Sequence, residues 1–153
     1  MSMSFDVNKF WKSTRGTALA EAAIVLPVLV LMLGAAAEFG RFMYYYNTLD
    51  KATLVSARYI STRALAASNL TDTQNMGVYG NTAGTGNKVL NDSNFTTANI
   101  SISPTSGTPQ TVTVSISGYT YTPIFAIGPM ANLVGIQIRP STTMRYLINT
   151  PTE

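Results

Sequence analysis

The chain has 153 residues and a net charge of +3, and charged residues make up only 11% of it, so there is room for one modest domain beside an apolar membrane segment. It contains neither cysteine nor histidine, which excludes a disulfide framework, most zinc sites, and the Ser-His and Cys-His nucleophile pairs. The seven acidic residues lack a paired or metal-ligand spacing and the positive charge is small and dispersed, so we expect no enzyme activity, metal, cofactor or nucleic-acid partner.

Residues 1–16 form a short polar leader in which cations predominate. Its charged residues are Asp6, Lys9, Lys12 and Arg15. Because positive charges beside a membrane span favour the cytoplasmic side, we expect this leader to stay in the cytoplasm. Everything after Glu38 is then expected to be exported.

Residues 17–38 predict a membrane-spanning helix. Sixteen uncharged residues, Ala22 to Ala37, separate Glu21 from Glu38, and about 20 mostly apolar residues cross a hydrocarbon core of roughly 30 Å. Two alternatives stay open, a secretory signal cleaved near Ala37 and the buried helix of a soluble core. The length of the run, the acid near its start and the helical pattern beyond it favour a retained membrane helix.

Residues 39–68 continue the helical pattern and would form the exported part of the same helix. A single helix from about Thr17 to Ala67 would be on the order of 75 Å long, with a kink or a freed carbonyl at Pro27. Glu38 and Arg41 are three residues apart and are expected to pair where the helix leaves the lipid. The aromatic residues that follow are Tyr44, Tyr45 and Tyr46. They predict either an aromatic belt at the outer interface or contacts with the exported head.

Residues 69–153 predict a loop followed by an antiparallel β head. Asn69–Gln110 is rich in Asn, Thr, Ser and Gly, which indicates a long surface loop. Asn99–Ser103 and Thr111–Ser117 read as the two strands of a hairpin with one buried face. The alternating apolar residues of that face are Ile100, Ile102, Val112, Val114 and Ile116. We expect the last three to face the long helix.

The remainder of the chain is expected to complete the head. The large residues occupy even-numbered positions before Gly118, in Val112, Val114 and Ile116, and odd-numbered positions after it, in Tyr119 and Tyr121. This change of parity predicts a bulge near Gly118. Pro123–Leu133 is an apolar connection that would cover the hairpin, Gly135–Arg139 alternates again, and Met144–Ile148 would close the sheet. The expected fold class is therefore α+β, with three or four antiparallel strands packed on the exported half of a long N-terminal helix.

The first third of the chain carries a set of residues that occur together in one kind of protein. They are Gly16, Glu21 five residues later within an apolar run, Pro27, the exit from Glu38 to Arg41, and Ala57-Arg58 further along. This set resembles type IV pilin-like proteins, and specifically the TadE-like pseudopilins of tight-adherence pilus systems. In such families a membrane aspartyl peptidase cuts after the glycine, and the glutamate is needed for assembly. The resemblance implies a cut between Gly16 and Thr17, although an aromatic residue commonly follows the glutamate and Ala22 stands there in this chain.

The resemblance also implies a function, partners and a location. The chain would be a structural or priming minor pilin, assembled through its apolar helix after leader cleavage. Its partners would be the prepilin peptidase, the major pilin and other minor pilins, and the inner-membrane assembly platform. It would cross the bacterial inner membrane once, with its head in the periplasm, and as a filament subunit it would enter the extracellular pilus. Two rivals stay open, a monomeric membrane-anchored accessory protein of pilus assembly and a secreted protein cleaved near Ala37.

Electrostatics gives Glu21 a role that does not depend on the resemblance. A carboxylate deep in a bilayer helix costs up to about 3 kcal/mol, so such a group is usually partnered or functional. After a cut at Gly16, the new amine of Thr17 would lie one helical turn from Glu21, where the two charges can neutralise each other within or between subunits. The competing interpretation is an interfacial glutamate that reaches water. Small residues along the apolar run would allow close helix approach: Ala18, Ala20, Ala22, Ala23 and Ala35 to Ala37.

Overall fold

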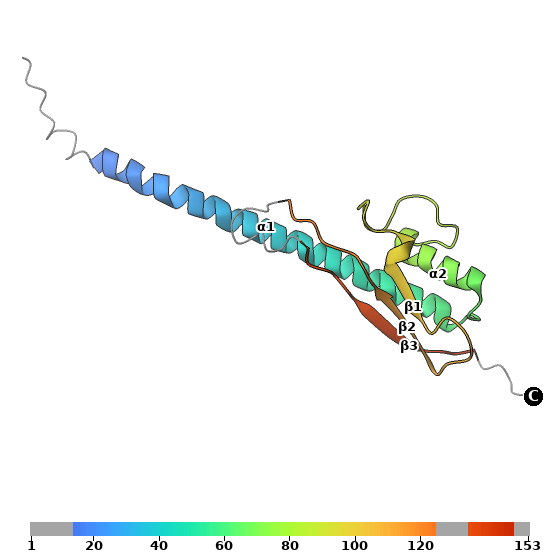
Figure 1. Cartoon of the computed structure of the whole chain (residues 1–153). Helices are drawn as coiled ribbons and strands as arrows, with labels where there is room; N and C mark the ends of the chain where they lie inside the picture. The colour runs from blue at the N-terminus through green and yellow to red at the C-terminus, as the bar shows by residue number, and fades with distance from the viewer. Residues whose placement is uncertain (1–13, 125–134, 149–153) are drawn as a thin grey trace, which may run out of the picture.

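The computed structural model describes residues 14–124 and 135–148, and its dominant element is the helix α1 (Thr14–Ser61). This helix has 48 residues, which corresponds to about 72 Å at 1.5 Å per residue. Its first half projects away from the rest of the chain, and its second half forms one side of the head (Figure 1). The α+β architecture with a long N-terminal helix is therefore confirmed.

The end of α1 differs from the prediction of a helix to Ala67. The helix ends at Ser61, where hydroxyl groups satisfy two of its last carbonyls: Ser61 Oγ donates to the carbonyl of Arg58 (2.9 Å) and Thr62 Oγ1 to that of Tyr59 (3.2 Å). The part of α1 that follows Glu38 is therefore shorter than the predicted residues 39–68. The helix continues through Pro27, and the kink at this residue stays a prediction.

A second helix, α2 (Ala67–Tyr79), occupies the start of the segment predicted as a surface loop, so that prediction was wrong. It ends at Gly80, whose positive φ of 70° lets its N–H donate to the carbonyl of Met76 (3.0 Å). The helix lies against α1 (Figure 1). At Gly77 the helix comes close to both α1 and the strand segment at Ile100, because an added Cβ would lie 2.7 Å from Ser56 Oγ and 2.9 Å from Ile100 Cδ1.

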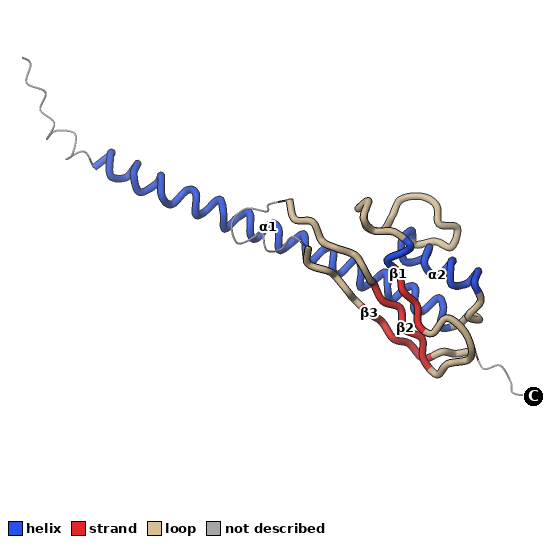
Figure 2. Tube along the Cα trace, in the orientation of Figure 1, coloured by secondary structure: helices blue, strands red, loops and turns tan. Residues whose placement is uncertain are grey.

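The head contains a three-stranded antiparallel sheet in the order β1-β2-β3 (Figure 2). Its strands are β1 (Ile100–Ser103), preceded by the short 3-10 helix η2 (Thr97–Asn99), then β2 (Thr111–Ile116) and β3 (Ser141–Arg145). Ile100 pairs with Ile116 and Ile102 with Val114, so the predicted hairpin is confirmed. Its predicted face is also confirmed, because Val112, Val114 and Ile116 are buried and β2 packs on α1.

Two later strand predictions were wrong in position. The strand that closes the sheet is Ser141–Arg145 instead of Met144–Ile148, because β2 pairs with that stretch from Thr111 to Ser115. Gly135–Arg139 forms no full strand among the described residues and contributes one bridge, between Gln137 and Thr120. Most of the predicted covering connection, Pro123–Leu133, lies outside the described residues.

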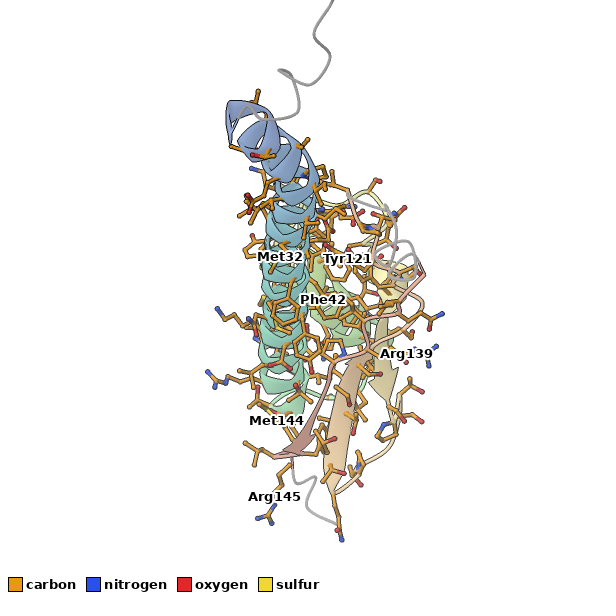
Figure 3. The ribbon with its side chains drawn as sticks, turned by 90° about the vertical axis from the view of Figure 1, so that its left-hand side faces the viewer. Met32, Phe42, Tyr121, Arg139, Met144 and Arg145 are labelled. Atoms are coloured by element: carbon orange, nitrogen blue, oxygen red, sulfur yellow. The ribbon has the colours of Figure 1, made fainter. Side chains whose placement is uncertain are left out.

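One hydrophobic core joins α1, α2 and the sheet. It contains Leu49, Ala57, Ile60, Val78, Leu90, Phe95, Ile100, Val112, Val114, Ile116, Tyr119, Tyr121, Ile138 and Tyr146. The predicted change of parity is present: Gly118 has φ 69°, and beyond it the buried residues are Tyr119 and Tyr121. Phe42 and Tyr121 meet at the end of this core nearest the projecting half of α1 (Figure 3).

Candidate functional site

The projecting half of α1 is the first candidate site, because its side chains are exposed along the whole of its length. Every residue from Gly16 to Leu33 whose burial is described is exposed. The large apolar side chains among them are Leu19, Ile24, Val25, Leu26, Val28, Leu29, Val30, Leu31, Met32 and Leu33. Within the described residues this helix is long and apolar enough to cross a membrane, and its most apolar window has no buried residue. Exposed apolar area of this size needs a lipid or protein environment.

Three of the predicted site residues lie together near the start of this half. Gly16, Thr17 and Glu21 are all exposed on α1, with Thr17 and Glu21 one helical turn apart. A side chain added at Gly16 would meet no atom within 4 Å. Glu38 lies about 26 Å further along the helix axis, so the structure separates the Glu21 site from the exit pair.

The second candidate site, here called the junction, is where the head begins, at Glu38. This carboxylate is only 1% exposed. Arg41 Nη1 lies 3.1 Å from Glu38 Oε1, so the two residues form the expected i,i+3 ion pair. The Tyr121 hydroxyl (2.5 Å) and the Ile124 backbone N–H (3.3 Å) also donate to Glu38 Oε1. The charge on Glu38 is thus buried with a cation and two further donors.

Aromatic rings enclose the junction. Phe42 and Tyr45 contact the Tyr121 ring edge to face, with centroids 5.4 and 5.3 Å apart, and the Arg41 guanidinium lies over the rings of Tyr45 and Tyr121. Burial, and then the hydrogen bond to Glu38, raise the pKa of Tyr121. The phenol therefore stays neutral and donates to the carboxylate at ordinary pH.

The three consecutive tyrosines divide between the two predicted roles. Tyr45 is partly buried in the core beside Tyr121, whereas Tyr44 and Tyr46 are exposed. The middle ring thus contacts the head, and the outer two face the surroundings, as residues of an interfacial belt would.

Sequence reasoning missed the partners that the head supplies to Glu38. Tyr121 is 83 residues from Glu38 in the sequence, and no local spacing predicts such a contact. The available signal was the change of parity near Gly118, which indicated that Tyr121 is buried. A buried tyrosine needs a hydrogen-bond partner, but the sequence does not say which acid supplies it.

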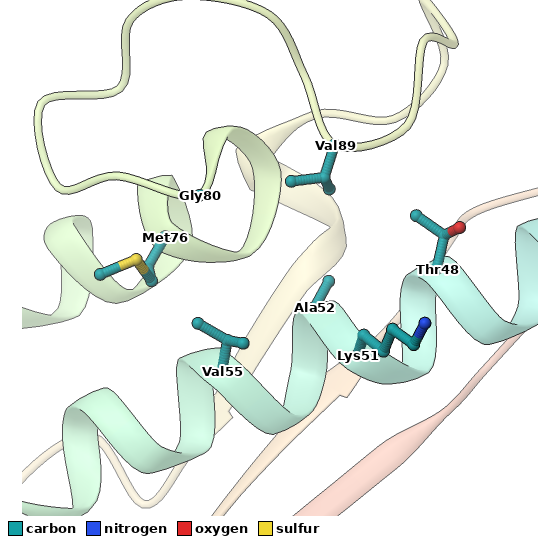
Figure 4. A pocket seen from close by; sticks show the side chains of 7 residues that line it. All are labelled: Thr48, Lys51, Ala52, Val55, Met76, Gly80 and Val89. Carbon is teal, nitrogen blue, oxygen red and sulfur yellow. The ribbon is translucent and has the colours of Figure 1, made fainter.

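A shallow groove lies between α1 and α2. It has a volume of about 240 Å³, and its lining consists of Thr48, Lys51, Ala52, Val55, Met76, Gly80 and Val89 (Figure 4). The lining is mostly aliphatic. It contains no carboxylate and no histidine that could activate Thr48 or Lys51 as a nucleophile. Among the described residues no three His, Cys, Asp or Glu side chains cluster as metal ligands would. Chemistry therefore does not favour the groove as a catalytic site.

The fold and the two sites define a class, a protein with one N-terminal apolar helix that could span a membrane and a small α+β head. Residues 16–58 match the family model described as TadE-like protein. The matched segment is most of α1, and over this segment the match confirms the resemblance. The segment contains all six predicted site residues, from Gly16 to Arg41. No curated protein and no solved structure matches the chain significantly.

Proposed function

We propose that this protein is a structural or priming minor pilin of a tight-adherence type IV pilus, assembled through the exposed half of α1 after removal of residues 1–16. The observation that carries the proposal is the combination of a TadE-like segment starting at Gly16 with an apolar helix whose side chains from Gly16 to Leu33 are exposed. A helix of this kind has its full circumference available for lipid before assembly and for neighbouring helices afterwards.

The proposed partners follow from the two ends of the helix. A prepilin peptidase would cut between Gly16 and Thr17, and the new amine would neutralise Glu21 of the same or a neighbouring subunit. Major and other minor pilins would pack against the apolar half, and the inner-membrane assembly platform would extract the subunit. The leader would face the cytoplasm and the head the periplasm.

Sequencing of the mature N-terminus tests the proposal. In a host with the cognate peptidase the chain should begin at Thr17, and Gly16→Leu should leave it full length. Gly16 is exposed on α1, and a Cβ added there meets no described atom within 4 Å. We therefore expect Gly16→Leu to leave the head folded, so a failure to cut this variant reports on the peptidase. A mature start at Glu38 would instead support the secreted rival, and an intact leader in the native chain would support a plain anchor.

Cofractionation separates the minor pilin from an anchored accessory protein. Sheared pili should contain the processed subunit in the wild type. A processed chain found only in the membrane fraction, while pili are still made, would contradict incorporation into the filament.

A further inference from the structure

Large apolar side chains stay exposed around α1 immediately beyond Glu38. We call these residues the collar: Phe39, Met43, Tyr44 and Tyr46 on α1, and Ile124 from the head. Phe39 and Ile124 are 62% and 68% exposed, although both lie beside the buried Glu38. Apolar side chains exposed together at one level of a protein usually mark a surface that another phase or molecule covers.

The distribution of the collar indicates what covers it. Successive residues of a helix are about 100° apart, so Phe39 and Met43, four residues apart, share one side of α1. Tyr44 points to another side, about 100° from Met43. The head covers the side of Glu38, and Ile124 adds exposed apolar surface on that side. A protein partner would contact one face, whereas the collar has apolar side chains on more than one side. It is also continuous with the stretch from Leu19 to Leu33, which is exposed around the whole helix, so lipid fits it better.

The length of the helix places the collar at the membrane boundary. A hydrocarbon core of roughly 30 Å corresponds to about 20 helical residues. If the charge of Glu21 lies at the inner boundary, the outer boundary falls near Arg41, and Glu38 lies about 4 to 5 Å inside it. The collar then straddles the boundary between hydrocarbon and headgroups, where aromatic residues are enriched.

The junction makes this depth possible for a charged residue. An unpartnered carboxylate within the hydrocarbon edge would be costly, but Glu38 receives the Arg41 guanidinium, the Tyr121 hydroxyl and the Ile124 N–H. Its charge is satisfied by the protein, so contact with lipid exposes no bare carboxylate.

We propose that the collar seats the head in the outer surface of the bilayer, with the Ile124 side chain inserted among the lipids. Ile124 lies at the level of Glu38, to which its N–H donates, and Leu147 lies near Ser61, to whose carbonyl its N–H donates (2.8 Å). These anchor points are about 35 Å apart along α1. The head therefore stands on the membrane with the Leu147 end in water. This inference rests on the proposed function only for the membrane-spanning role of α1.

Single-tryptophan variants test the inference in phosphatidylcholine vesicles. The sequence contains one tryptophan, Trp11, so Trp11→Phe supplies a silent background. Three single variants are made in this background. Ile124→Trp is the test, and Leu147→Trp is its matched control, because Leu147 has a similar exposure (63%). Val30→Trp is the reference for the membrane-spanning part of α1. Each full-length variant is compared in vesicles with brominated and with ordinary acyl chains.

The expected result is blue-shifted emission and strong bromine quenching at positions 30 and 124, with a several-fold smaller loss of fluorescence at position 147. Quenching of Val30→Trp without quenching of Ile124→Trp would overturn the collar while leaving the membrane helix in place. A blue shift of Ile124→Trp without quenching would mean that a second copy covers it, and would equally overturn the inference. Absence of quenching of Val30→Trp would instead contradict the proposal that α1 spans the membrane. Equal protease resistance of the three variants is the check on folding.

Discussion

Glu38 shows at the level of single residues how a buried charge is supplied with hydrogen-bond and ion-pair partners. Its partners come from two directions, Arg41 from the next helical turn and Tyr121 from the head. Together they fix the orientation of the head at the point where α1 emerges from it. A carboxylate at this position acts as the attachment point of the head rather than as a solvent-exposed exit marker.

The first prediction removes one donor from this carboxylate. Tyr121→Phe retains the ring that contacts Phe42 and Tyr45 but leaves the buried Glu38 with one hydrogen bond fewer, at a cost of about 1–3 kcal/mol. Urea unfolding of the full chain in detergent, followed by circular dichroism, measures the loss. Tyr44→Phe is the matched control, because Tyr44 is exposed (61%) and its change should be within about 0.5 kcal/mol. Equal urea midpoints for the two variants would show that the hydrogen bond from Tyr121 to Glu38 does not stabilise the head.

A second residue-scale prediction concerns alkaline pH. Burial raises the pKa of Tyr119 and of Tyr121, and the hydrogen bonds to Asp92 and Glu38 raise them further. A group whose pKa is higher in the folded state binds its proton more tightly there, so its contribution is complete below the unfolded value of about 10 and is lost above it. Tyrosine ionisation should therefore not affect the melting temperature at neutral pH. The melting temperature should fall as the pH rises beyond about 10.

Tyrosinate absorbance provides the check on the alkaline prediction. Ionisation of the last tyrosines should coincide with loss of the folded signal, and Tyr119→Phe should make the decline with pH shallower, because one of the two protons is no longer linked to folding. Complete ionisation of all eight tyrosines with the head still folded would contradict it.

At the scale of elements, β2 is the strand on which the head depends, because it pairs with β1 and β3 and packs on α1. Val114→Asp should bury an unpaired charge and destabilise the head by several kcal/mol. Ser115→Asp changes the next residue on the opposite, partly exposed face and should have a small effect. Limited proteolysis of the two variants compares them directly. Equal sensitivity would mean that the Val114 face of the sheet does not pack on α1.

Strict alternation made this hairpin predictable, whereas α2 could not be predicted in the same way. In α2 the buried residues are Thr73, Gly77 and Val78, two of which carry no strong hydrophobic signal. Gly77 is buried because the helix approaches Ser56 and Ile100 closely, and a glycine that provides such an approach looks in the sequence like a loop residue. The loop prediction, which rested on composition, was therefore wrong for α2, because small and polar residues form the contact surface of this helix.

For the same reason the candidate sites were predictable to different degrees. Glu21, Glu38 and Arg41 stood out because charges beside an apolar run are rare and need explanation. The closing strand was misplaced because Ser141–Arg145 has no buried residue of its own and is identified only by its pairing with β2. Local patterns therefore specify amphipathic elements well, whereas contacts made by distant backbone partners depend on the tertiary structure.

At the scale of the whole molecule, the chain separates two tasks along α1. The half from Gly16 to Leu33 is exposed and apolar, and the half from Leu49 to Ser61 supplies the core of the head. The junction at Glu38 connects them. Changes in the first half should therefore affect assembly while leaving the head folded, and changes in the second half should do the reverse.

Glu21→Ala tests this separation directly. The substitution removes the proposed charge partner of the Thr17 amine, but it leaves Gly16, the apolar run and every contact of the head in place. We expect a chain that is cut at Gly16, held in the membrane and folded in its head, yet strongly depleted from sheared pili. Glu21→Asp, which keeps the charge on a shorter side chain, should restore part of the assembly. Because the proposed ion pair would form in or near lipid, where charges are weakly screened, the loss should persist at high salt. Wild-type amounts of Glu21→Ala in sheared pili would assign Glu21 to the membrane boundary alone and leave anchorage as the function of this half of the helix.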